Sequence, residues 1–204
     1  MSITGKKRIG ILGGSFNPIH NAHLSLSRQA AGALGLDRVI LIPTGDSPYK
    51  DYGSVTREDR YRMTCLAAQG DSLFTVERIE IDRPGQSYTC DTMRELRERE
   101  DAEYYFISGS DILFQLGDWM RSEELMKLTR FAFALRRNVD NSSCLREAER
   151  LSLGYGAGIV LLEDITVEGI SSTMVREAAA CGTDFRDMVP EAVADYIISK
   201  ELYC

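Results

Sequence analysis

Short apolar runs alternate along the chain with longer segments in which apolar residues recur every three or four positions. Runs of four to eight apolar residues are typical of buried strands, and the wider spacing is typical of helices that cover them. This alternation predicts an α/β protein with a mainly parallel sheet. Strands are expected at 8–12, 38–43, 74–81, 104–108, 131–135 and 158–162, and helices at 22–34, 56–68, 91–99, 111–120, 122–128, 144–153, 173–180 and 191–202.

Length and composition favour one folded domain over residues 1–204, because no linker rich in Pro, Gly or Ser interrupts the pattern. Apolar residues make up 44%, which is enough to exclude an intrinsically disordered chain. The 24 Lys and Arg against 31 Asp and Glu give a formal charge of −7. An acidic average argues against a nucleic-acid partner but leaves room for a local cationic pocket that binds a small anion.

The compartment is expected to be the cytoplasm. No apolar run reaches the length of about 18 residues that a membrane span needs, and the N-terminus does not read as a signal region. The five cysteines are scattered and include no C-x-x-C pair, which indicates reduced thiols rather than disulfides or a zinc site. Neither a membrane nor a nucleic acid is expected as a partner.

The first loop carries the most distinctive residues. In open α/β sheets, ligands bind beyond the carboxyl ends of the strands. Gly13 and Gly14 lie at that end of the first expected strand and allow a close approach of the backbone to a ligand. His20 and His23, the only two histidines, follow at a spacing that places both on one face of a first helical turn. Two imidazoles there can donate hydrogen bonds to phosphate oxygens. They could instead be capping or core-edge residues, or two ligands of a metal that lacks a third.

Two further loops offer cations and hydroxyls. Ser171–Thr173 are good helix N-caps, and their hydroxyls can also bind phosphate. Arg176 is expected in the first turn of the same helix, where a positive charge is unfavourable because the helix dipole is positive at that end. An anion bound between Arg176 and the helix end would remove this conflict. The alternative is a surface arginine offset by Glu177. Lys50, alone, would be a solvated loop lysine.

Residues 13–23, GGSFNPIHNAH, resemble the G-x-F-x-P-x-H-x-x-H motif of the nucleotidyltransferases related to class I tRNA synthetases. Residues 170–176, ISSTMVR, are similar to the I-S-S-T-x-x-R signature of the same superfamily, and 43–50 has the form of its loop with a lysine after prolines. The superfamily's usual H-x-G-H carries Ala22 in place of glycine, which predicts slight crowding of the ligand.

Two more segments resemble bacterial nicotinate mononucleotide adenylyltransferases. Residues 83–92, RPGQSYTCDT, are similar to their R-x-G-x-S-Y-T-x-D-T segment, and 107–111, ISGSD, followed by Trp119, is similar to their G-[AS]-D…W segment. The resemblance implies a Rossmann-like, doubly wound sheet with helices on both faces. It also implies transfer of an adenylyl group from ATP, with Mg²⁺, to nicotinate mononucleotide, giving deamido-NAD and pyrophosphate in NAD biosynthesis.

The resemblance assigns the site residue by residue. His20, His23 and Arg176 would be catalytic, and no resident metal ligands are expected. ATP would be bound by Gly13, Gly14, Ser15, Phe16, His20, His23, Lys50, Gly109, Asp111, Ser172, Thr173 and Arg176. The mononucleotide would be bound by Ser15, Phe16, Lys50, Ser87, Tyr88, Thr89, Thr92 and Trp119, whose ring would stack on the pyridine. Taken alone, Trp119 would be a core aromatic and Asp111 a helix N-cap.

The reaction implied needs no general base, because a phosphate monoester with a second pKa near 6 is already anionic at neutral pH. Alternatives are a phosphopantetheine or other small-phosphate adenylyltransferase of the same superfamily, and a nucleotide-binding sensor without turnover. Residue types alone do not decide whether the acid or the amide mononucleotide is preferred. They also do not decide the oligomeric state (a homo-oligomer is one possibility), the regulation or the role of Cys204.

Overall fold

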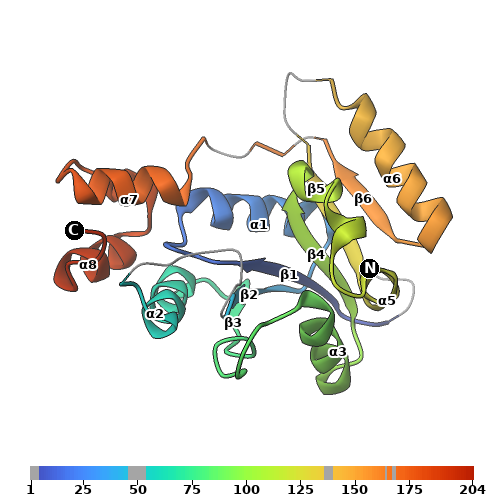
Figure 1. Ribbon diagram of the computed structural model, residues 1–204, viewed down its shortest axis with the longest axis horizontal. Coiled ribbons are helices and arrows are strands. Elements are labelled where there is room, and N and C mark those ends of the chain that lie inside the picture. Colours follow the sequence, from blue (N-terminus) through green and yellow to red (C-terminus); the bar gives the residue numbers. More distant parts are fainter. Residues whose placement is uncertain (1–4, 46–53, 136–139, 164, 167–168) are drawn as a thin grey trace. The chain divides into compact units, whose positions relative to one another are not determined.

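The computed structural model describes residues 5–45, 54–135, 140–163, 165–166 and 169–204 (Figure 1). A six-stranded sheet has the order β3-β2-β1-β4-β5-β6, and β1, β4, β5 and β6 pair in parallel. The parallel α/β fold predicted from the sequence is therefore confirmed. The strands are β1 (Arg8–Gly14), β2 (Arg38–Pro43), β3 (Phe74–Val76), β4 (Glu103–Gly109), β5 (Arg130–Ala134) and β6 (Ile159–Leu162).

Helices alternate with the strands along the chain, as expected of a parallel sheet. The α-helices are α1 (Asn21–Leu34), α2 (Arg57–Ala68), α3 (Thr89–Arg99), α4 (Ser110–Leu113), α5 (Ser122–Leu128), α6 (Ser142–Tyr155), α7 (Ser172–Ala180) and α8 (Glu191–Ser199), and 3₁₀ turns lie at η1 (Leu116–Asp118) and η2 (Arg186–Met188). None of the helices in the described part of the chain has the length and apolar character of a membrane span.

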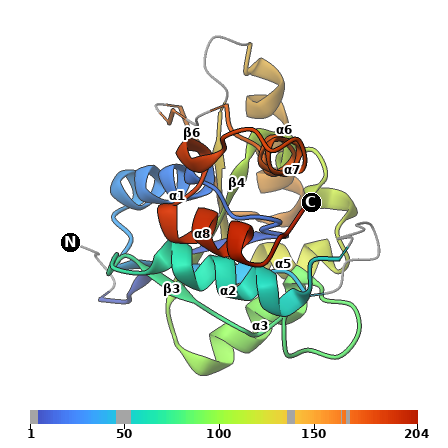
Figure 2. The ribbon, with the colours of Figure 1, turned by 90° about the vertical axis from the view of Figure 1, so that its left-hand side faces the viewer.

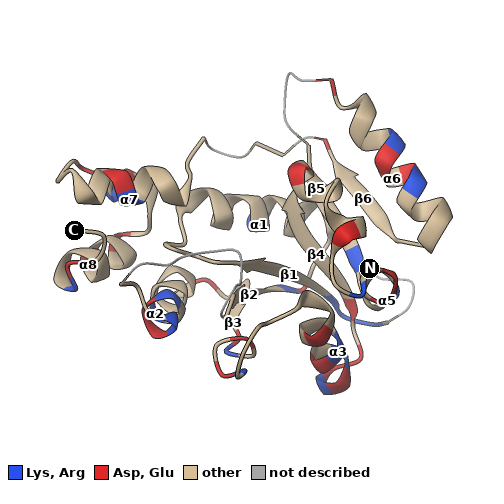
Figure 3. Ribbon diagram, in the orientation of Figure 1, with Lys and Arg blue, Asp and Glu red and all other residues tan. Residues whose placement is uncertain are grey.

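Contacts group the chain into two compact units. The first comprises residues 1–12, 26–40 and 88–166, and the second 13–25, 41–87 and 167–204. The single domain over 1–204 stays a prediction. Within the first unit, the part of α1 that it contains lies on one side of β4, and α3 and α5 lie on the other (Figures 1 and 2). Charged residues of both signs gather on α3 and α6, whereas the strands carry few (Figure 3).

The core of the first unit explains a glycine in the middle of a strand. Ile107 and Phe131 on β4 and β5 are fully buried. A Cβ at Gly10 of β1 would lie 2.8 Å from Cδ1 of both Ile107 and Leu36. Gly10 therefore lets the segment after α1 pack directly on the strand.

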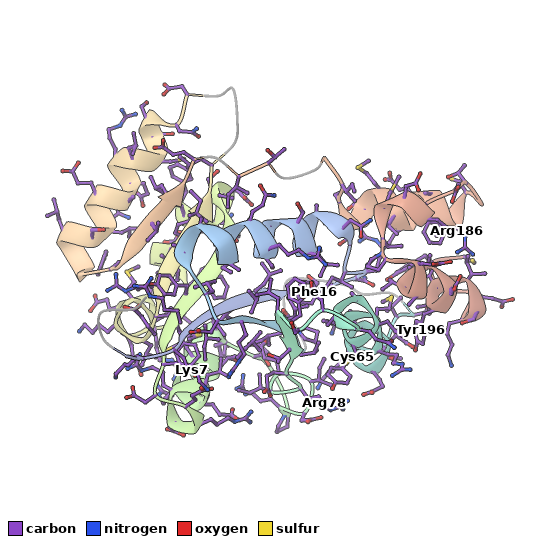
Figure 4. The ribbon with its side chains drawn as sticks, turned by 180° about the vertical axis from the view of Figure 1, so that it is seen from behind. Lys7, Phe16, Cys65, Arg78, Arg186 and Tyr196 are labelled. Atoms are coloured by element: carbon purple, nitrogen blue, oxygen red, sulfur yellow. The ribbon has the colours of Figure 1, made fainter. Side chains whose placement is uncertain are left out.

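The second unit is built round α2, which packs against β3 and α8. Thr56 caps α2 in a capping box: its Oγ1 accepts from the Asp59 N–H, and the Asp59 carboxylate accepts from the Thr56 N–H. Tyr196 reaches across from α8 and donates to Asp59 Oδ1 at 2.9 Å (Figure 4). A long side chain of the last helix is thus fixed to the start of α2.

Three expected elements end earlier than the pattern indicates. The strand expected over 74–81 stops at Val76, and the Asp82 N–H donates to Arg78 O at 3.0 Å, which closes a turn instead. Ile79 and Ile81 are still buried, so their alternation reflects burial in a turn rather than a strand. The helix expected over 111–120 breaks after Leu113 into η1, and the one expected over 191–202 ends at Ser199.

Candidate active site

The loop after β1 folds round one aromatic side chain. Phe16 is 2% exposed and has a left-handed backbone with φ of 46° (Figure 4). A Cβ at Gly14 would lie 2.9 Å from Phe16 Cε1, so a glycine is needed where the ring folds back under the strand end. The loop continues through a cis Asn17–Pro18 peptide to His20, which directly precedes α1.

The two histidines contact each other. Their rings stack with centroids 3.6 Å apart, and the Phe16 ring meets His23 edge-on with centroids 5.2 Å apart. The His20 N–H donates to His23 Nδ1 at 3.2 Å. Because Nδ1 accepts this bond, a neutral His23 carries its proton on Nε2, which is then a donor. The His23 ring can therefore fill both roles considered from the sequence: its Nδ1 caps the backbone and its Nε2–H is a donor.

His20 differs from His23 in its surroundings. It is 6% exposed, and burial lowers its pKa to about 4. Among the described residues, nothing bonds its buried Nδ1. His20 is therefore neutral at pH 7 before a ligand binds.

Helix α7 meets the same loop. Ser171 is its N-cap and accepts from the Met174 N–H at 3.3 Å, as expected, while the Ser172 hydroxyl donates to Pro18 O at 2.8 Å. Arg176 donates from Nη1 to Asn17 O at 2.9 Å and from Nη2 to Thr173 Oγ1 at 3.1 Å. It is the fifth helical residue, so its expected position in the first turn was wrong by one residue.

These contacts bring the three predicted catalytic residues to one loop. Arg176 lies on the carbonyl of Asn17, three residues before His20, and His20 stacks on His23. An arginine has five N–H donors, and within the described part of the chain Arg176 uses the two groups just given. The remaining donors suit a planar, oxygen-rich anion such as a phosphate.

One residue of this region was not found from the sequence. Arg60 of α2 is fully buried; its Nη1 donates to Ser15 O at 2.8 Å and its Nη2 to Gly45 O at 3.1 Å. It therefore joins the loop after β1 to the loop after β2. Space there is tight, because a Cβ at Gly45 would lie 2.3 Å from Glu80 O and 2.9 Å from Ser87 Oγ.

The first unit holds four of the eight residues expected to bind the mononucleotide, together with Asp111, which is expected to bind ATP. Trp119 packs edge-on against Phe106 of β4, with ring centroids 5.6 Å apart. Tyr88 is the N-cap of α3 and Thr89 its first residue, whereas Thr92 is 2% exposed. Asp111 is exposed and is not an N-cap; Gly109 is, and a Cβ there would lie 2.6 Å from Asp111 Oδ1.

Gly13, Ser87 and Lys50 are also expected to contact a ligand. Gly13 is exposed at the end of β1. The Ser87 Oγ is buried and has no hydrogen-bond partner among the described residues. Lys50 lies outside the described residues. No group of three or more His, Cys, Asp or Glu in the described ranges is arranged to hold a metal ion.

Comparisons with known proteins agree with the motifs. Residues 11–178 match the family model described as cytidylyltransferase-like. A protein of Thermoanaerobacter sp., named "Probable nicotinate-nucleotide adenylyltransferase", is 36% identical over 96% of this chain and 94% of its own. A protein of Leifsonia xyli with the same name is 37% identical over 100% of this chain and 98% of its own.

Solved structures share the fold. The nicotinic acid mononucleotide adenylyltransferase of Plasmodium falciparum complexed with NaAD has a TM-score of 0.75 at 21% identity, over 97% of both chains. The same protein complexed with APC has a TM-score of 0.71 at 20% identity, again over 97% of both chains. The Rossmann-like architecture, with helices on both faces of a parallel sheet, is therefore confirmed.

Proposed function

The chain belongs to the nicotinate-nucleotide adenylyltransferase family, and we propose that it transfers the adenylyl group of ATP to nicotinate mononucleotide. A phosphate oxygen of the mononucleotide bonds to the α-phosphorus of ATP. The bond from that phosphorus to the oxygen bridging to the β-phosphate breaks, and pyrophosphate leaves. The products are deamido-NAD, a precursor in NAD biosynthesis, and pyrophosphate.

The observation that carries this proposal is the convergence of His20, His23 and Arg176 on the loop after β1. An attacking phosphate and a triphosphate repel each other, so the protein must hold both in line and stabilise charge on the departing group. Arg176 supplies a permanent positive charge, and His23 supplies an Nε2–H donor whose orientation is fixed by its Nδ1 bond. No residue needs to remove a proton, because the attacking phosphate is ionised at neutral pH.

His20 contributes in a different way. Because burial lowers its pKa to about 4, it meets the incoming nucleotide as a neutral donor. A phosphate placed beside it favours the protonated form and raises that pKa. His20 is thus suited to gain charge only once the nucleotide is bound.

Magnesium belongs to the substrate in this proposal. Mg²⁺ binds through phosphate oxygens and water with few protein carboxylates, so it enters as the complex with ATP. Asp111 is an exposed carboxylate beside Gly109 and suits a contact to that complex or to the ribose. When bound, the ion neutralises charge on the phosphates.

The remaining assignments are proposed on the family's residues. The mononucleotide is bound by Ser15, Phe16, Lys50, Ser87, Tyr88, Thr89, Thr92 and Trp119. The partners of the protein are small molecules rather than a nucleic acid or a membrane. The protein acts in the cytoplasm, and its molar mass in solution tests whether it forms a homo-oligomer.

The test is a pyrophosphate-release assay with Mg·ATP and, in turn, nicotinate mononucleotide, its amide and 4′-phosphopantetheine. Pyrophosphate and an equal amount of dinucleotide are expected with a pyridine mononucleotide, and the rates with acid and amide give the preference directly. Fastest release with phosphopantetheine would reassign the acceptor. Nucleotide binding without release from any acceptor would indicate a sensor.

A further inference from the structure

The C-terminal end of the chain reaches the loop that carries the candidate catalytic residues. Tyr203, the penultimate residue, donates from its phenol to Asn17 Oδ1 at 2.8 Å. Asn17 is 7% exposed, and its backbone oxygen is the acceptor for Arg176 Nη1 at 2.9 Å. One residue thus receives a bond from the chain end on its side chain and a bond from α7 on its backbone.

The backbone at the chain end is shaped for this contact. Glu201 and Tyr203 both have left-handed backbones, with φ of 51° and 70°. Left-handed geometry is unfavourable for residues with a Cβ, so other contacts must hold it. Leu202 lies between these two residues and is 8% exposed. Its N–H donates to Ile197 O at 3.0 Å, which holds the chain end against α8.

The electrostatic surroundings keep the phenol a donor. Burial raises the pKa of Tyr203 far above its usual value, and the nearby Arg176 and Arg60 oppose this only in part. The hydroxyl therefore stays protonated, and remains a donor, at neutral pH. The guanidinium that touches Asn17 and the phenol that touches Asn17 therefore lie within electrostatic reach of each other.

We propose that Tyr203 is a positioning residue for adenylyl transfer: its bond to Asn17 fixes the backbone oxygen that orients Arg176. This inference rests on the proposed function. Losing the phenol frees the Asn17 side chain and loosens the acceptor of Arg176 Nη1, so the guanidinium no longer meets the nucleotide in one geometry. The motifs named from the sequence lie between residues 13 and 119 and at 170–176, and Tyr203 is outside all of them.

Two matched variants test the proposal. Tyr203→Phe removes the bond to Asn17, and Tyr196→Phe removes a similar bond, to Asp59 Oδ1 at 2.9 Å, elsewhere in the C-terminal segment. Tyr203→Phe is expected to lower kcat/KM for ATP by about threefold to tenfold, the range for one hydrogen bond, while KM for the mononucleotide is unchanged. Tyr196→Phe is expected to retain wild-type kinetics.

A double-mutant cycle separates positioning from general stability. If Tyr203 acts through Arg176, Tyr203→Phe has little further effect in an Arg176→Lys background. Equal losses in both tyrosine variants, or full additivity with Arg176→Lys, would overturn the proposal. Should Tyr203→Phe not fold, the chain ending at Leu202 is the second variant; the same loss is expected of it, and wild-type kinetics would overturn the proposal.

The affinity for Mg·ATP, measured by calorimetry, keeps this test independent of turnover. A wild type that forms no dinucleotide from any acceptor would refute the proposed function alone. In that case a weaker affinity in Tyr203→Phe than in Tyr196→Phe still supports positioning by Tyr203. Equal affinities would overturn it.

Discussion

The two histidines differ in what surrounds their rings, and this difference predicts a pH dependence. His20 is buried with a pKa of about 4, against 6.5 when exposed in the unfolded chain. Between these values the unfolded state binds more protons, so the free energy of unfolding falls as the pH falls from 6.5 to 4. Above pH 6.5 the contribution is constant, and the full loss is about 3 kcal/mol.

The measurement compares wild type with His20→Gln by urea unfolding at several pH values. The wild type should lose more stability than the variant between pH 6.5 and 4, and the two curves should run parallel above that range. Because the chain has only two histidines, NMR titration also resolves His20 directly. A His20 pKa near 6.5 in the ligand-free protein would refute the argument.

For His23 we predict a role in adenylyl transfer rather than in stability. Its Nδ1 is occupied by the His20 N–H, which leaves the Nε2–H as a fixed donor. We expect His23→Ala to lower kcat by roughly 10²–10³, the usual loss for a donor that stabilises developing charge, with folding nearly intact. Arg28→Ala, an exposed change on the same helix, is the control. Near-wild-type turnover of His23→Ala under saturating ATP would remove the histidine from the mechanism.

A substitution of Trp119 tests whether this residue binds the mononucleotide. Its ring is half-buried and meets Phe106 edge-on. If a face of the ring stacks on the pyridine, Trp119→Ala should raise KM for nicotinate mononucleotide by about tenfold or more and KM for ATP little. Steady-state kinetics with each substrate varied gives both values. Equal effects on the two would make Trp119 a core aromatic.

At the scale of elements, α2 supports two loops through one buried arginine. Arg60→Met leaves the carbonyls of Ser15 and Gly45 without these bonds, and each buried acceptor left unpaired costs about 1–3 kcal/mol. We expect a loss of about 2–5 kcal/mol in the free energy of unfolding. Arg62→Met, an exposed change on the same helix, should stay within about 0.5 kcal/mol. Equal urea midpoints for the two variants would contradict the bracing role of Arg60.

Sequence reasoning succeeded where local chemistry decides the structure. The Gly13–Gly14 strand end, the Ser171 cap and the placement of both histidines at the start of α1 follow from short-range preferences. Arg60 could not be singled out, because Arg57 and Arg62 stand beside it in a strongly charged helix and only tertiary packing buries one of the three. The strand was predicted to extend to residue 81 for a similar reason, because the buried Ile79 and Ile81 alternate with polar residues as in a strand.

At the scale of the whole molecule, the charge of −7 separates a small anion site from a polyanion surface. A nucleic acid needs many cations on one face, and several of those on α3 and α6 are paired: Arg94 with Asp91 and Glu124, and Arg150 with Glu147 (Figure 3). Arg176, by contrast, lies on a backbone carbonyl, so its charge is available to one bound phosphate group. The protein is therefore expected to bind ATP but not duplex DNA or RNA.

Fluorescence anisotropy with a labelled duplex at physiological salt tests this expectation. Proteins that bind nucleic acid without sequence preference have Kd values of about 10⁻⁴–10⁻⁶ M at such salt, so no change in anisotropy is expected up to about 100 μM protein. Labelled ATP analogue in the same buffer is the positive control. Saturable binding of the duplex in the micromolar range, weakening steeply as salt rises, would show a cationic surface that the charge pattern argues against.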